Sequence, residues 1–109
     1  MSTSTPLEWH VGLVGYGEVG RILAEDLRAL GVRVSAYDAK LAGAAGDAMR
    51  GHAETHGVTL VASHAALAAQ ADLVVSAVTA SQAVPVAQAC APALRRGAYF
   101  LDLNSASPG

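Results

Sequence analysis

The sequence is short of several residue types, and each shortage excludes a class of structure. Cys90 is its only cysteine, so the chain forms no internal disulfide and no cysteine-based metal or redox pair. We expect Cys90 to be a small buried residue of a helix in a reducing compartment. No apolar run approaches membrane-spanning length, and the first residues lack the basic and apolar regions of a signal peptide. We therefore expect a cytoplasmic protein with no membrane partner.

Charged residues are also scarce, at 15% of the 109 residues, and the net charge at pH 7 is −2. This charge gives no electrostatic reason to expect nucleic acid as a partner. Hydrophobic residues make up 52% of the chain. That composition suits a single α/β domain, in which helices cover both faces of a sheet and leave few positions for charged side chains.

Short apolar runs alternate with helical patterns along the chain. We predict strands at residues 9–14, 32–37, 58–61, 73–78 and 98–103. We predict helices from the first glycine-rich segment to Gly31, at 41–56, from Ser63 to about Gln70, and at 81–95, the last with Pro85 in its first turn. The first helix carries apolar residues at helical spacing, namely Val19, Ile22, Leu23, Leu27 and Leu30. Alternating strands and helices predict a doubly wound parallel sheet in three α-β-α layers.

The two ends of the chain lead to an expectation about its extent. Residues 1–8 are polar and are expected to form a flexible lead-in, followed by one domain over 9–109. Ser107 and Pro108 suit the N-cap and first position of a further helix. We therefore predict that the domain is truncated after its fifth strand, although a disordered tail is the alternative.

Residues 15–20, which we call the glycine turn, match the pattern G-x-G-x-x-G: Gly15, Tyr16, Gly17, Glu18, Val19 and Gly20. The match is weak alone, but an apolar strand precedes it and an amphipathic helix follows, as in a Rossmann-type fold. Gly15 allows a sharp turn, Gly17 lets a diphosphate approach the backbone, and Gly20 lets the helix pack on the sheet. The N–H groups of the helix's first turn then attract the diphosphate.

Asp38 ends the second predicted strand, where such folds place the acid that binds the adenosine ribose. A carboxylate there accepts hydrogen bonds from the ribose hydroxyls and repels a 2′-phosphate, which favours NAD over NADP. Lys40 offsets part of that repulsion, so NADP stays possible. The alternative is that Asp38 only caps the turn that follows the strand.

The fourth and fifth strands should end at the same edge of the sheet as the glycine turn, because all the strands are parallel. Val78 and Thr79 follow the fourth strand, and Asn104 and Ser105 follow the fifth. We expect these four residues beside the nicotinamide half of the dinucleotide, where Asn104 and Ser105 hydrogen-bond the ribose or the carboxamide. An ordinary turn is the alternative for the last two.

Two segments carry a resemblance to a known family. They are Gly12-Leu13-Val14-Gly15-Tyr16-Gly17-Glu18-Val19-Gly20 and Asp102-Leu103-Asn104-Ser105-Ala106-Ser107-Pro108. Both resemble the N-domain signatures of the β-hydroxyacid dehydrogenases, which include 3-hydroxyisobutyrate dehydrogenase and 6-phosphogluconate dehydrogenase-like proteins. More typical members have Asp-x-Ser-Thr in the second segment. The cofactor contact of that Thr therefore falls to Ser105.

The resemblance implies an NAD(P)-dependent dehydrogenase that transfers a hydride between a nicotinamide and a small hydroxyacid. In complete members a helical C-terminal domain carries the catalytic lysine and forms the contacts of a homo-oligomer, and we expect that domain to lie outside these 109 residues. We accordingly assign no catalytic residue and expect this fragment alone to be inactive. A non-enzymatic dinucleotide sensor and the N-domain of an imine reductase are the alternatives.

Three other features give weaker signals. His52 and His56 lie four residues apart on one helical face, which suits a metal, but no third ligand stands out in the sequence. We interpret them as a solvated helix surface and predict no metal site. Trp9 and Tyr16 could each stack on an adenine. For Trp9, packing at the sheet edge is the better interpretation, and Tyr16 could instead shield the diphosphate.

Overall fold

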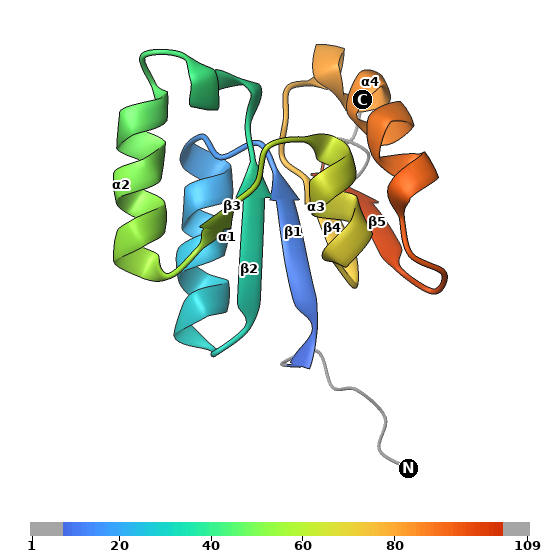
Figure 1. Cartoon of the computed structure of the whole chain (residues 1–109), viewed down its shortest axis with the longest axis horizontal. Helices are drawn as coiled ribbons and strands as arrows, with labels where there is room; N and C mark the ends of the chain where they lie inside the picture. Colours follow the sequence, from blue (N-terminus) through green and yellow to red (C-terminus); the bar gives the residue numbers. More distant parts are fainter. Residues whose placement is uncertain (1–7, 104–109) are drawn as a thin grey trace.

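The computed structural model describes residues 8–103, which form five strands, four α-helices and two 3-10 helices (Figure 1). In chain order the strands are β1 (His10–Val14), β2 (Arg33–Tyr37), β3 (Thr59–Leu60), β4 (Leu73–Ser76) and β5 (Tyr99–Asp102). The α-helices are α1 (Glu18–Ala29), α2 (Gly46–His56), α3 (His64–Gln70) and α4 (Ala80–Cys90), and the 3-10 helices are η2 (Ala39–Ala42) and η3 (Ala91–Ala93).

All five strands are parallel and lie in the order β3-β2-β1-β4-β5. Strand β1 lies at the middle of the sheet; from it the chain runs outward through β2 and β3 and then returns to the other side of β1 (Figure 1). Right-handed crossovers in the two directions place helices on opposite faces of the sheet. The predicted doubly wound, Rossmann-type α/β fold is therefore confirmed.

The core is divided between the two faces of the sheet, and β1 supplies side chains to both. Val11 and Leu13 join the cluster beneath α1 and α2, whereas Val14 joins the one beneath α3 and α4. Gly12 also faces α3, since a Cβ added there would lie 2.9 Å from Leu67 Cγ. The strand is buried on both faces, which explains why it reads as an uninterrupted apolar run.

The region predicted as one helix over 41–56 is instead divided in two. Asp38 caps η2 by accepting a hydrogen bond from the Lys40 N–H, and α2 begins only at Gly46. A Cβ added at Gly46 would lie 2.1 Å from the Leu41 carbonyl oxygen. Gly46 therefore permits a close approach between η2 and α2, which a single continuous helix would not need.

Helix α4 also differs from the prediction. It begins at Ala80, so Pro85 is its sixth residue rather than part of the first turn. Since proline has no N–H, the Ser81 carbonyl lacks its usual helical donor. The helix ends at Cys90 and is followed directly by η3, of which Pro92 is the second residue. Cys90 itself is fully buried, as expected, and burial raises the pKa of its thiol.

The apolar residues of α1 do not all face the sheet. Gly20 and Ala24 are its buried residues, with Leu23 packed partly against the core. Val19 and Ile22 are each 52% exposed, so the apolar spacing was a poor guide to the buried face. At Gly20 the helix lies against the Gly15 carbonyl of the glycine turn, a contact that leaves no room for a side chain. No helix within residues 8–103 is long and apolar enough to cross a membrane.

Candidate functional site

The glycine turn connects β1 to α1 at the carboxyl edge of the sheet. Gly15 has a φ of +93°, a left-handed conformation that favours glycine, and its N–H donates to the Tyr37 carbonyl at 2.8 Å. A Cβ added at Gly20 would lie only 2.0 Å from the Gly15 carbonyl oxygen. These two glycines therefore allow the chain to reverse sharply and the helix to begin directly against the turn.

The first turn of α1 is open to a ligand. Gly17 is the N-cap residue, and no side chain caps this end of the helix. A Cβ added at Gly17 would meet nothing within 4 Å, so the space beside its Cα is empty. The N–H groups at the start of a helix have no partner within the helix and attract an anion. This cradle fits a diphosphate.

Asp38 stands at the end of β2 with its carboxylate facing the glycine turn. Its Oδ2 accepts a hydrogen bond from the Tyr16 N–H at 2.8 Å, and its Oδ1 accepts one from the Lys40 N–H at 2.8 Å. The capping interpretation of Asp38 is thus observed. It does not conflict with ribose binding, because each carboxylate oxygen has a second lone pair and Asp38 lines the adjoining pocket.

A pocket of about 570 Å³ opens along the carboxyl ends of the strands, which is within the usual range for small-molecule sites. Five of the residues predicted to bind a cofactor line it: Gly15, Gly17, Asp38, Val78 and Thr79. Glu18, Val19 and Gly20 belong to the adjoining first turn of α1 but do not line the pocket. The predicted contacts of Asn104 and Ser105 fall outside residues 8–103.

Neither aromatic ring considered as an adenine platform lines this pocket. The Tyr16 ring is fully buried, and its hydroxyl is 2.5 Å from His52 Nδ1 on α2. Burial raises the pKa of Tyr16 to about 12. Trp9 stacks on Tyr99, with ring centroids 5.6 Å apart, beside the amino ends of β1 and β5. Packing of Trp9 against the sheet is therefore confirmed, whereas the Tyr16 ring packs in the core with an edge contact to His52.

Two polar residues of the pocket, His64 and Gln82, were not predicted from the sequence. His64 is the first residue of α3, and its ring makes an edge contact with the Tyr37 ring at a centroid distance of 4.7 Å. A signal for it was present in the sequence. Ser63 was recognised as the N-cap of this helix, and a residue just after an N-cap in this fold lies at the ligand edge of the sheet.

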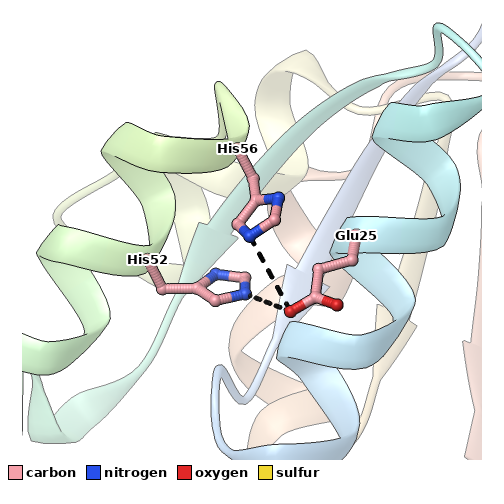
Figure 2. A group of neighbouring side chains, drawn as sticks. All are labelled: Glu25, His52 and His56. Carbon is pink, nitrogen blue, oxygen red and sulfur yellow. Dashed lines mark hydrogen bonds and ion pairs between the residues drawn. The ribbon is translucent and has the colours of Figure 1, made fainter.

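The interpretation of the two histidines of α2 as a solvated helix surface is corrected for His52, whereas the His56 side chain is 36% exposed. The His52 side chain is only 14% exposed, and Glu25 of α1 lies against both imidazoles (Figure 2). Glu25 is the third ligand-type residue that the sequence did not reveal. It belongs to a different helix, so the spacing along α2 contained no sign of it.

Comparison with known proteins agrees with this geometry. Residues 2–98 match the family model of the D-isomer specific 2-hydroxyacid dehydrogenase, NAD binding domain. A solved conserved hypothetical protein from Sinorhizobium meliloti is 31% identical, with a TM-score of 0.80 over 89% of this chain and 32% of its own. No curated protein matches this chain.

Two further solved structures share the fold at lower identity. The 3-hydroxyisobutyrate dehydrogenase of Mycobacterium tuberculosis, solved with L-serine, is 22% identical, with a TM-score of 0.75 over 87% of this chain and 31% of its own. The D-mandelate dehydrogenase of Rhodotorula graminis is 23% identical, with a TM-score of 0.73 over 93% of this chain and 28% of its own. The chain thus spans about a third of the length of these structures.

The fold and the open cradle define a dinucleotide-binding domain of the oxidoreductase class. The family match over residues 2–98 makes the assignment specific. This chain belongs to the family of D-isomer specific 2-hydroxyacid dehydrogenase NAD-binding domains, and NAD is its cofactor. The resemblance to β-hydroxyacid dehydrogenases is supported only at the level of the fold, because the matching 3-hydroxyisobutyrate dehydrogenase is 22% identical.

Proposed function

We propose that this chain is the cofactor-binding half of an enzyme that transfers a hydride between NAD and a small hydroxyacid. One observation carries the proposal: the uncapped start of α1 adjoins a pocket of about 570 Å³ with the Asp38 carboxylate on its lining. An anion-attracting helix end and a carboxylate at the neighbouring strand are the two features needed to hold a diphosphate and the adjacent ribose.

Each part of the cradle has a separate task in this proposal. The backbone at Gly17 leaves room for the diphosphate, and the N–H groups of Glu18 and Val19 donate to it. Asp38 accepts hydrogen bonds from the hydroxyls of the adenosine ribose. Because Asp38 is already held by the Tyr16 and Lys40 N–H groups, its carboxylate is oriented before the cofactor arrives. Little ordering entropy then remains to oppose binding.

The nicotinamide half is proposed to lie at the other end of the pocket. Val78 and Thr79 line the pocket after β4, and α4 begins there with no side-chain cap of its own. Ser76 of β4 is in register with Asp102 of β5, so the residues that follow both strands leave the sheet at the same edge. Asn104 and Ser105 are therefore proposed to hydrogen-bond the nicotinamide ribose or carboxamide.

The substrate class has two candidates, each with its own support. The matched family favours a D-2-hydroxyacid. The Asp102-to-Pro108 segment favours a β-hydroxyacid, for which the catalytic lysine would lie in a further domain. Lys40 cannot serve, since it is beside Asp38 at the adenosine end. The two substrate classes are distinguished by comparing the rates at which a version of the protein extended by such a domain oxidises D-2-hydroxyacids and 3-hydroxyacids. The chain of 109 residues alone should turn over neither.

Titration with NADH and NADPH tests the cofactor site. We expect the wild-type protein to bind NADH more tightly than NADPH. Asp38→Arg should weaken NADH binding by at least about ten-fold and move the preference toward NADPH. The substitution removes the carboxylate that accepts hydrogen bonds from the ribose and supplies a cation that pairs with the 2′-phosphate. Asp26→Arg, the same charge change at an exposed position of α1, is the matched control and should leave both affinities within about two-fold. A folded Asp38→Arg variant that retains the wild-type preference would refute the ribose assignment.

A further inference from the structure

A second cluster of ionisable side chains lies between α1 and α2, apart from the cofactor pocket. It consists of Glu25 of α1 with His52 and His56 of α2 (Figure 2). Glu25 Oε2 is 2.7 Å from His52 Nε2 and 3.8 Å from His56 Nε2. One ligand atom from each residue falls within 4.8 Å of the other two. All three side chains thus converge on one point, as metal ligands do.

Helix geometry holds this arrangement in place. His52 and His56 are four residues apart and therefore lie one above the other on the same face of α2. Their rings are tilted by 33°, with centroids 4.4 Å apart. Small rotations of the two rings and the carboxylate bring the three ligand atoms to the separations of a tetrahedral site, in which each bond is about 2.0–2.1 Å long.

The hydroxyl of Tyr16 fixes the orientation of His52. It bonds Nδ1 of the ring at 2.5 Å, which leaves Nε2 directed at Glu25. A histidine that binds a metal through one nitrogen nearly always has its other nitrogen hydrogen-bonded in this way.

The cluster is accessible on its outer side. The side chains of His52, His56 and Glu25 are 14%, 36% and 45% exposed. A shallow depression of about 200 Å³, also lined by Glu18 and Arg21, adjoins Glu25 and His52. An ion can enter there, and a water molecule has room to complete its coordination.

We propose that Glu25, His52 and His56 form a Zn²⁺-binding site that joins α1 to α2. Two imidazoles and one carboxylate are a set that zinc accepts with water as the fourth ligand, whereas magnesium and calcium prefer oxygen ligands alone. The bound ion holds the two helices together. Through His52 and Tyr16 it also supports the glycine turn, since Tyr16 belongs to that turn. The site does not depend on the proposed hydride transfer.

Metal titration of untagged, chelator-treated protein tests the site. Co²⁺ serves as the spectroscopic substitute, and Zn²⁺ is then added in competition. We expect one ion per chain and the intense visible absorption of four- or five-coordinate Co²⁺. Zn²⁺ at about a hundred-fold excess over its Kd should raise Tm by about 10 °C. Absence of saturable binding, or the weak absorption of octahedral Co²⁺, would overturn the proposal.

Variants distinguish the three-residue site from simple binding to neighbouring histidines. Glu25→Gln and His56→Asn should each weaken Zn²⁺ binding by more than about 100-fold, and Tyr16→Phe, which acts only through His52, by about ten-fold. Glu54→Gln removes an exposed carboxylate from the same helix α2 and should change nothing. If Glu25→Gln binds Zn²⁺ as tightly as wild type, the histidines act alone and the proposed site is wrong. Circular dichroism without metal verifies that each variant is folded.

Discussion

Two glycines of the glycine turn offer a matched pair of substitutions, Gly17→Ala and Gly20→Ala. Both add one methyl group, three residues apart, but the structure assigns them opposite effects. At Gly17 the new Cβ meets nothing within 4 Å, whereas at Gly20 it would lie 2.0 Å from the Gly15 carbonyl oxygen. The first should chiefly impair cofactor binding, and the second should chiefly damage the fold.

The cost at Gly20 follows from that short distance. Ordinary contact begins at 3.4 Å, so α1 and the turn must separate by about 1.4 Å. Overpacking of this kind costs about 1–3 kcal/mol, and the upper end applies because the atom in the way is backbone. Alanine returns up to about 1 kcal/mol in helix propensity. The net loss of about 2 kcal/mol should lower Tm by about 10 °C.

For Gly17→Ala we expect the free energy of unfolding to fall by about 1 kcal/mol, because alanine is a poorer N-cap residue than glycine, while the added methyl group itself meets no atom within 4 Å. The methyl group instead occupies the space proposed for the diphosphate. NADH affinity should therefore fall by at least about ten-fold. Nitrogen-edited NMR titration measures weak affinity and shows whether the N–H signals of Glu18 and Val19 shift, while thermal unfolding measures stability.

Either half of this reasoning can fail independently. If Gly17→Ala binds NADH as wild type does, the diphosphate does not lie at the start of α1. If Gly20→Ala unfolds at the wild-type temperature, the close packing of α1 on the turn is incorrect.

Three further predictions concern stability. Burial lowers the pKa of His10, so the unfolded chain binds the proton more tightly than the folded one. The free energy of unfolding should therefore fall as the pH drops below the ordinary His pKa of 6.5. His10→Gln should reduce this dependence of stability on pH, as measured by urea titrations at several pH values. Cys90 is fully buried and its thiol pKa is raised, so its reaction with a thiol reagent should proceed at the rate of unfolding. A fast reaction of the folded protein would contradict its burial. Leu67→Ala removes a fully buried side chain beneath α3 and should cost about 2–5 kcal/mol in chemical denaturation; a loss below about 1 kcal/mol would contradict its place in the core.

Several elements could be predicted because their signals are local. The apolar run of β1 and the capping serine of α3 each specify an element without help from distant residues. Errors arose where tertiary contacts override local preference. Residues 41–56 are helix-favouring by composition, yet close packing of η2 on α2 at Gly46 interrupts them. The exposed Ile22 shows the same limit, since apolar spacing alone does not tell which side of a helix meets the sheet.

The candidate site divides in the same way. The glycine turn and Asp38 were found from sequence because backbone conformation and position at a strand end are local properties, and parallel strands bring their carboxyl ends to one edge. The place of Gln82 in the pocket depends on the packing of α4, which spacing along the chain does not encode, whereas His64 could have been found from its position directly after the N-cap of α3.

By itself, the amino-acid sequence determined the order of strands and helices, the glycine turn and the acid that faces it, since each depends on a few neighbouring residues. The tertiary structure alone decided that Glu25 meets His52, 27 residues away along the chain, and that Tyr16 turns its hydroxyl toward the same histidine. Such a meeting depends on how α1 and α2 are rotated about their axes. That rotation is set by the packing of both helices on the sheet, to which residues throughout the chain contribute.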